Sequence, residues 1–345
     1  MPASLEEVSR RAGVSISTAS RILSNDPHYS FKSRTRQRVL DACHDLQYQP
    51  NLAARALASG RSRIVAFVVP RVQETPFTAL GSLQVLAGLE EAFSARGYHI
   101  LLSSPRLADG NVDPAFTQLM QSGYLEGIVL DGHFAVDPLL QILQRQRLPC
   151  VTIGHPNYPY TIRADDDGGY RMLVAHLVEL GHRQIGIIGL DHTLFPSGRH
   201  RLAALRAAAE RHGLTAETMP YVESRFGRQH GVLLIRQLLA EHPGLTALVA
   251  LNDRLALDAL HALRMLGVRV PEDLAVAGHD DLPQAADVLP SLTTINQGLH
   301  RWGEYAADML FALAAGGEPE AVVMQTRLVV RDSTAPPSAA PVLPR

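Results

Sequence analysis

Near the amino terminus the sequence predicts two short helices joined by a tight turn, and this pattern limits the fold of that region more than any other feature. Ser4 and Glu7 have the spacing of a capping box, so a first helix is expected to start there. Gly13 ends that helix, and Ser15 is suited to cap the next one. The pattern predicts a helix-turn-helix, whose second helix must be small enough to enter a DNA major groove.

The second predicted helix has an apolar face, formed by Ala19, Ile22 and Leu23, and a face rich in hydroxyl groups. Hydroxyl and guanidinium groups can hydrogen-bond to phosphates and base edges, so this second face is the candidate DNA-contacting surface. The candidate contact residues on it are Ser15, Ile16, Ser17, Thr18, Ser20 and Arg21.

A third helix is expected to begin at Ser33, which would act as its N-cap. Its inward residues are predicted to be Val39, Leu40, Cys43 and Leu46, and its outward residues Arg34, Arg36 and Arg38. In the loop before this helix, Tyr29 or Lys32 could contact the DNA backbone.

The alternative interpretation of the segment is an ordinary solvated helical hairpin, and charge favours the DNA-binding interpretation over it. Residues 1–63 contain ten Lys and Arg against five Asp and Glu, a local net charge of +5. The remainder contains 22 against 29, or −7. A basic head on an acidic body is expected when only one end of a chain neutralises phosphates.

Several segments resemble the lactose-repressor (LacI/GalR) family of transcription regulators. They are EEVSRRAGVSISTASRILS, TRQRVLDACHDLQYQPN, AARALASGRSRIVAFVVP, HLVELGHRQIGIIG, ALVALNDRLALDALHALRMLGVRVPEDLAVAGHDD and LPSLTTINQ, so the resemblance covers nearly the whole chain. It implies a sequence-specific regulator, a homodimer or a higher oligomer, that binds a pseudo-palindromic operator in double-stranded DNA. Repression relieved by a small effector is the commoner mode in this family, and activation or co-repression stays open.

The resemblance also assigns roles within the head. The positions matching the family's base-reading residues are Ile16, Ser17 and Arg21. Arg21 could form a bidentate contact with guanine, and contact with phosphate alone is the alternative. After Pro50 the resemblance implies a hinge helix whose leucine enters the minor groove, with a flexible linker as the other interpretation. The candidate DNA contacts in this helix are Asn51, Ala54 and Leu57.

From Arg63 onward, short β-branched runs alternate with amphipathic helical segments. The first predicted series has strands at 64–69, 100–103, 127–130 and 151–153, with helices near 79–96, 114–122 and 137–146. The second has strands at 185–189, 247–250, 274–277 and 327–330, with helices near 167–180, 198–212, 227–241, 252–266 and 299–314.

The predicted fold is therefore an all-α helix-turn-helix head plus an α/β body of two successive doubly wound subdomains. The resemblance identifies this body as periplasmic-binding-protein-like, with the chain crossing between the subdomains more than once. The predicted domains are a head over 1–49, a hinge helix and linker over 50–62, an effector-binding and dimerisation body over 63–336, and a loose tail over 337–345.

Ligands of doubly wound sheets bind outside the carboxyl ends of the strands, so two facing subdomains predict a cleft. The resemblance implies a sugar or sugar derivative as the effector. The candidate effector-binding residues are Arg71, Phe77, His155, Arg201, Asn252, Asp280 and Gln297. Arg201 could instead be a surface charge, and Asn252 could simply cap its helix.

Two departures from the family pattern bear on the ligand. Gly154 and His155 stand where many sugar-responsive members have an acidic residue, and Arg71 stands where an Asp is usual. A carboxylate lost and a cation gained favour an anionic ligand, such as a sugar phosphate, over a neutral sugar. The alternative is that Arg71 is turned outward or paired with Glu74.

Catalysis and cofactor binding are disfavoured by the motifs of the chain. The clusters 165–167 and 279–281 contain carboxylates that could bind a cation, but acidic residues before a helix are also explained by the helix dipole. The sequence contains no HExxH, GxSxG, Walker or Cys/His ligand motif, so neither an enzyme nor a metal or other cofactor is expected. The competing classes are a cleft-type small-molecule receptor without a gene-control role and an enzyme-like body joined to a DNA-binding head.

No apolar run suits a secretory signal or a membrane span, so a cytoplasmic location is expected. Cys43 and Cys150 lie in apolar segments, which favours buried reduced thiols over a disulfide.

Overall fold

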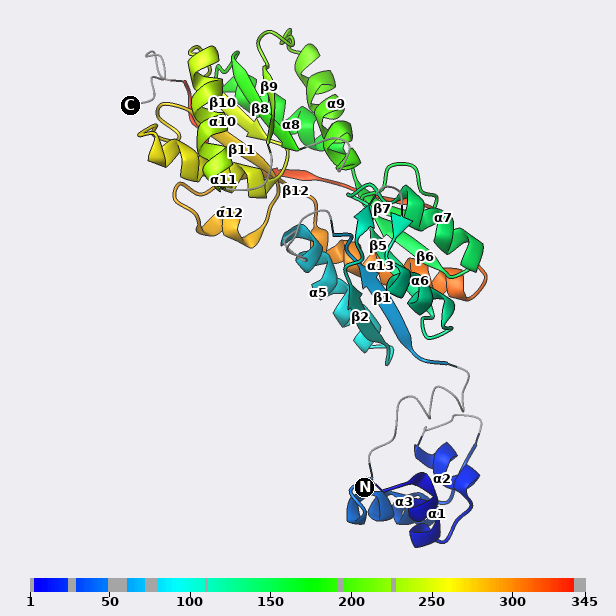
Figure 1. Cartoon of the computed structure of the whole chain (residues 1–345). Helices are drawn as coiled ribbons and strands as arrows, with labels where there is room; N and C mark the ends of the chain where they lie inside the picture. The colour runs from blue at the N-terminus through cyan, green and yellow to red at the C-terminus, as the bar shows by residue number, and fades with distance from the viewer. Residues whose placement is uncertain are drawn as a thin grey trace. The chain divides into compact units, whose positions relative to one another are not determined.

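The structure, a computed structural model, describes residues 3–23, 29–48, 61–71, 80–108, 111–190, 195–224 and 228–337. The chain divides into two compact units, residues 1–63 and 64–345, and each is considered by itself (Figure 1). Some predictions lie outside the described residues, namely the hinge helix with Asn51, Ala54 and Leu57, the candidate effector residue Phe77, Glu74, and the tail beyond residue 337.

The head contains the three predicted helices, α1 (Leu5–Ala12), α2 (Ile16–Leu23) and α3 (Ser33–Asp45). The capping box at Ser4 and Glu7 is confirmed, and Gly13 closes α1 in the left-handed conformation at φ 61°. Ser15 caps α2 as predicted, because its hydroxyl oxygen accepts a hydrogen bond from the Thr18 backbone N–H at 3.1 Å. The turn therefore has the geometry of a helix-turn-helix.

The head core is small, and two predictions about α3 are wrong. The buried apolar residues shared by the three helices are Val8, Ala12, Ala19, Ile22, Val39 and Ala42. Leu40 is 45% exposed, because it lies one position off the face that carries Val39 and Ala42. Ser33 is the first residue of α3 and not its cap; the N-cap is Lys32, which makes no side-chain capping bond.

The first sheet of the body has six parallel strands in the order β13-β7-β6-β5-β1-β2. Their bounds are β1 Ile64–Val68, β2 His99–Ser103, β5 Gly127–Asp131, β6 Cys150–Ile153, β7 Thr161–Ala164 and β13 Val322–Met324. The helices of this subdomain are α5 (Leu80–Ser94), α6 (Pro114–Gln121), α7 (Asp137–Gln146) and α13 (Leu299–Ala314). A short hairpin of β3 (Leu107–Ala108) and β4 (Asn111–Val112) follows β2.

The second sheet has the order β14-β12-β11-β10-β8-β9 and is parallel except for β14, which runs antiparallel to β12. Its strands are β8 Ile185–Leu190, β9 Tyr221–Ser224, β10 Ala247–Ala250, β11 Ala275–Asp280, β12 Thr293–Asn296 and β14 Arg327–Val329. Its helices are α8 (Asp166–Glu179), α9 (Pro196–Glu210), α10 (Arg228–Glu241), α11 (Asp253–Met265) and α12 (Pro283–Asp287).

Two parallel-sheet subdomains are confirmed, and so is the expectation that the chain crosses between them more than once. It crosses from β7 to α8, from β12 to α13 and from β13 to β14. The prediction that segment 299–314 belongs to the second subdomain is wrong, because α13 packs on α5 and on strands β5, β6 and β7 of the first (Figure 1).

Two glycines, one in each helix, let α5 and α13 approach closely and explain this position of α13. A Cβ at Gly88 of α5 would collide with the backbone carbonyl of His300, and one at Gly303 would collide with the backbone of Val85. Hydrogen at both positions lets the two helices touch along their backbones. None of the helices in the described part of the chain is both long and apolar enough to span a bilayer.

Candidate functional site

The outward face of α2 carries the candidate DNA contacts. Ile16 is 50% exposed, Ser17 and Arg21 are also exposed, and Thr18 and Ser20 are half-buried. The Ser15 hydroxyl lies 2.9 Å from that of Ser17 and 2.8 Å from that of Thr18, so the three form one linked cluster. This face offers hydroxyl groups, one apolar side chain and one guanidinium, which are groups suited to phosphates, a thymine methyl and guanine.

The ring of Tyr29 supports Arg21. The sequence had suggested for Tyr29 only a contact with the DNA backbone. The guanidinium carbon of Arg21 lies 4.0 Å from the centre of the Tyr29 ring. Tyr29 in turn stacks on Phe31, with ring centres 6.4 Å apart and planes inclined by 19°, and Phe31 packs against the head core. The interaction is of the cation–π type and holds Arg21 at the surface of the head.

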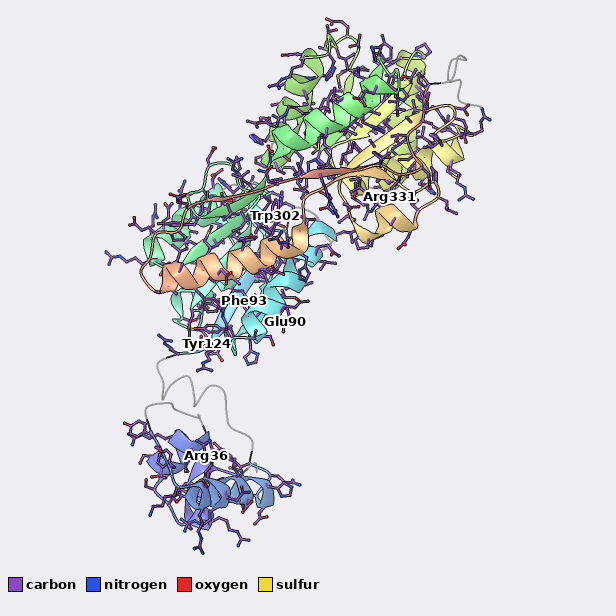
Figure 2. All side chains as sticks on the ribbon, turned by 180° about the vertical axis from the view of Figure 1, so that it is seen from behind. Arg36, Glu90, Phe93, Tyr124, Trp302 and Arg331 are labelled. Carbon is purple, nitrogen blue, oxygen red and sulfur yellow. The ribbon has the colours of Figure 1, made fainter. Side chains whose placement is uncertain are left out.

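In the body, a pocket of about 360 Å³, part of it open to solvent, lies between the two subdomains. It is lined by His133, Gly154, Pro156, Arg163, Ala164, Asp166, Ser197, His200, Arg201, Gln297 and Trp302. Several of these residues follow the carboxyl ends of β5, β6, β7 and β12, where a ligand of a doubly wound sheet is expected. Figure 2 shows Trp302 near the start of α13, on the side of the second subdomain.

Arg201 is buried at the centre of this pocket and binds groups from three elements. One terminal nitrogen, Nη1, donates to the carbonyl of Leu251 at 2.8 Å, and Nη2 lies 3.2 Å from Oδ1 of Asp280. Its Nε lies 4.0 Å from Oδ1 of Asp166. Burial raises the pKa of Asp166 and of Asp280, although the Arg201 guanidinium opposes this effect on both carboxyls. The Arg201 guanidinium thus lies beside two buried carboxyls and balances part of their charge.

Three buried polar atoms near Arg201 lack a hydrogen-bond partner among the described residues. They are Oδ1 of Asp166, Nε2 of His279 and Oε1 of Gln297, of which the first two lie 3.5 Å apart. Gln297 is 1% exposed, and its Nε2 donates to Oδ1 of Asp280 at 2.6 Å. Burial lowers the pKa of His279 well below its usual value, so this ring is neutral. Unpaired buried polar atoms are costly, and a polar ligand would satisfy them.

The structure thus brings together three of the predicted effector residues, Arg201, Asp280 and Gln297. Asp166 was interpreted through the helix dipole, and most of the other pocket residues were not predicted. Those not predicted are His133, Pro156, Arg163, Ala164, Ser197, His200 and Trp302. His133 follows a correctly predicted strand, so its place at a carboxyl end was a signal that could have found it.

The other described candidates do not line this pocket. The Asn252 side chain caps α11 by accepting from the Leu255 backbone N–H at 2.8 Å. His155 lies 3.7 Å from Asp137, and burial lowers its pKa. Nε of Arg71 is buried without a hydrogen-bond partner among the described residues. A role in effector binding for these three residues stays a prediction.

The two units together define a class of protein, a helix-turn-helix DNA-binding protein with a periplasmic-binding-protein-like body. Residues 4–51 match the family described as bacterial regulatory proteins, lacI family, and residues 174–334 match a periplasmic binding protein-like domain. The HTH-type transcriptional regulator CelR of Thermobifida fusca is 32% identical over 95% of this chain and 97% of its own length. The regulator DegA of Bacillus subtilis is 30% identical over 97% and 99%.

Solved structures agree with these relatives. A CelR–cellobiose complex is 30% identical, with a TM-score of 0.70 over 96% of this chain and 99% of that one. The Lac repressor dimer bound to operator and an anti-inducer, at 24% identity, shares the fold with a TM-score of 0.83 over 97% and 100%. The chain belongs to the lacI family of bacterial regulatory proteins. It is a DNA-binding transcriptional regulator and not an enzyme.

Proposed function

We propose that this regulator is a repressor that binds a pseudo-palindromic operator as a homodimer in the cytoplasm and is controlled by a sugar bound between its two subdomains. The observation that carries the proposal is the pocket around Arg201, where the buried acceptors Oδ1 of Asp166 and Oε1 of Gln297 make no hydrogen bond within the described part of the chain. Hydroxyl groups of a sugar would supply the missing donors. The exposed face of α2, together with the hinge residues Asn51, Ala54 and Leu57, would contact DNA.

The ion pairs of Arg201 favour a neutral sugar over an anionic one, whereas Arg163 and His200, which also line the pocket, favour an anion. Arg201 is already shared by Asp166 and Asp280, so its charge is compensated before a ligand arrives. Arg71, the cation that favoured an anion in the sequence, is not among the residues lining the pocket. A phosphate or carboxylate would meet the two buried carboxyls and be repelled by them. Because the related CelR has been solved with cellobiose, cellobiose is the first probe.

The pocket is built from both subdomains, so a ligand in it can change how they close. On the first subdomain it touches His133 and Trp302, and on the second it touches Ser197 and Arg201. A ligand that contacts both sides favours the closed arrangement, and it can shift DNA binding only as far as its affinities for the two arrangements differ. Because repression relieved by the effector is the commoner mode in this family, sugar binding is expected to release the operator.

The test is a gel shift with genomic fragments at several salt concentrations, with and without cellobiose. We expect a retarded fragment whose binding weakens steeply with salt, because Lys and Arg displace counterions from DNA, and whose release follows added sugar. The absence of any retarded fragment at low salt would contradict the regulator proposal. Tighter binding in the presence of sugar would make the sugar a co-repressor.

Isothermal titration then tests the ligand class. We expect heat with cellobiose or another neutral disaccharide and none with glucose 6-phosphate. Binding of the phosphorylated sugar alone would restore the anionic interpretation suggested by Arg71.

A further inference from the structure

The ring of His133, which follows β5 and lines the pocket, is held on three sides. Its Nδ1 lies 2.8 Å from Oδ1 of Asp131. Its face stacks on Trp302, with ring centres 5.8 Å apart and planes inclined by 15°. Its far edge, which carries Nε2, lies so close to Gly154 that a Cβ there would collide with the ring. A ring held on three sides has one orientation, so the fold determines the direction in which Nε2 can form a hydrogen bond.

Asp131 determines which nitrogen of this ring carries the proton. Its side chain is 1% exposed and accepts hydrogen bonds from the Ser82 hydroxyl of α5 and, at 3.1 Å, from the His133 backbone N–H. An ionised carboxylate can only accept, so the proton between Asp131 and His133 belongs to Nδ1. In the neutral ring Nε2 is then an acceptor. Among the described residues, none forms a hydrogen bond with Nε2.

His133 also lies where the two subdomains meet. Its backbone carbonyl accepts a hydrogen bond at 3.1 Å from the hydroxyl of Ser197 on α9. Trp302, on which the ring stacks, is 1% exposed and is itself anchored, because its Nε1 donates to the carbonyl of Gln297 at 2.9 Å. A ligand contact at His133 therefore touches a rigid group that both subdomains support.

We propose that His133 is a specificity-determining residue of this pocket, whose Nε2 accepts a hydrogen bond from a ligand hydroxyl, and that Asp131 and Trp302 are its positioning residues. The inference rests on the proposed function, since it assigns a contact within the effector pocket. It adds a third acceptor to those of Asp166 and Gln297. A hydroxyl group satisfies such a set, whereas a phosphate or carboxylate oxygen would place a lone pair against a lone pair.

The substitution His133→Asn tests the contact. The Asn amide can still donate to Asp131 from near the position of Nδ1, but it has no atom at Nε2. We expect the affinity for cellobiose in isothermal titration to fall about tenfold, the size of one lost hydrogen bond. The matched control is His176→Asn on α8, a half-buried ring that hydrogen-bonds to Thr334 away from the pocket. This variant should bind cellobiose as the wild type does.

The substitution Asp131→Ala tests the positioning. It removes the oxygen that accepts from both the His133 backbone N–H and Nδ1, so nothing holds the ring proton on Nδ1; the proton can move to Nε2, which turns the acceptor into a donor. We expect weaker cellobiose binding and a changed tautomer in ¹⁵N NMR of the histidine-labelled full chain. The His133 signal is identified by its loss in His133→Asn. A merely structural role for Asp131 would leave the tautomer unchanged.

Two outcomes would overturn the inference. One is a wild-type His133 that carries a proton on Nε2, whether the ring is neutral or doubly protonated, and the other is wild-type cellobiose affinity in His133→Asn. If the wild type binds neither cellobiose nor another neutral disaccharide, the proposed ligand class fails, and the NMR measurement still decides the state of the ring.

Discussion

Arg21 reaches the proposed DNA-contacting face of the head across the ring of Tyr29, and this pair makes a residue-scale prediction. Replacing Tyr29 by Leu removes the ring that holds the guanidinium, so we expect DNA binding to weaken by about 0.5–1 kcal/mol, a factor of about two to five. Replacing it by Phe keeps the ring and should change binding little. Fluorescence anisotropy with a retarded genomic fragment measures both.

A double-mutant cycle shows whether Tyr29 acts through Arg21. In an Arg21→Ala background, Tyr29→Leu should cost nothing further, because its partner is already gone. Fully additive losses would contradict the positioning role and indicate that Tyr29 contacts the DNA itself.

The buried carboxyl of Asp253 predicts a pH dependence of stability. Burial, with a contribution from the negative charge of Asp280, raises the pKa of Asp253 from 3.8 to about 7. The folded state then holds this proton more tightly than the unfolded state. The stability that this group contributes is full below 3.8 and is lost as the pH rises through about 7.

Urea unfolding at a series of pH values measures this effect. Between the two pKa values the free energy of unfolding of the wild type should fall, by at most about 1.4 kcal/mol per pH unit from this group. Asp253→Asn cannot titrate, so its curve should fall less steeply, whatever its absolute stability. An equal slope in both proteins would show that Asp253 keeps its ordinary pKa in the fold.

Single residues also show how far the site could be predicted. Asp165 and Asp166 are adjacent and were explained alike, by the helix that follows them. That explanation holds for Asp165, which caps α8 by accepting from the Gly168 backbone N–H at 2.9 Å. The neighbouring Asp166 lines the pocket, and its Oδ1 lies 3.5 Å from Nε2 of His279. The crossover between the sheets sets this position, and no local pattern encodes it.

At the scale of elements, the contact between α5 and α13 depends on two glycines, and Gly88 makes a prediction. A Cβ at Gly88 would meet the backbone carbonyl of His300, which cannot rotate away as a side chain can. Gly88→Ala should therefore lower the free energy of unfolding by about 1–3 kcal/mol, the usual cost of overpacking. Urea unfolding of the full chain measures this loss.

Gly231 of α10 is the matched control, because it is also helical but a Cβ there would make only an ordinary van der Waals contact, 3.9 Å from the Asp258 carbonyl oxygen. Gly231→Ala should stabilise the protein by up to about 1 kcal/mol through helix propensity. If both substitutions were stabilising, the two helices would not touch as closely as the structure shows.

The strands of the body and helix α13 show which elements could be predicted from the sequence. Strands such as β5, buried along its whole length, read as continuous apolar runs and were found. Strands β7, β9 and β12, whose sequences are TIRA, YVES and TTIN, were missed because polar residues interrupt the apolar run, and the three-residue strand β13 was missed as well. Helix α13 was found but assigned to the wrong subdomain, since its partner α5 lies far away in the sequence.

At the scale of the whole molecule, three crossings of the chain tie the two sheets of the body together. A ligand that closes the pocket must therefore move all three connections at once, which favours two discrete arrangements of the body over a continuous range. If one of these arrangements suits DNA and the other suits the sugar, the two binding sites are coupled through a single equilibrium.

Such coupling is reciprocal and can be measured from both ends. If saturating cellobiose weakens binding to the operator fragment by some factor, saturating fragment must weaken cellobiose binding by the same factor, because both close one thermodynamic cycle. We expect a factor of about 5–150, the usual range of such couplings. Anisotropy gives the first value and isothermal titration the second. A scrambled duplex of equal length should leave the sugar affinity unchanged, and two unequal factors would mean that a further step, such as a change of oligomeric state, separates the sites.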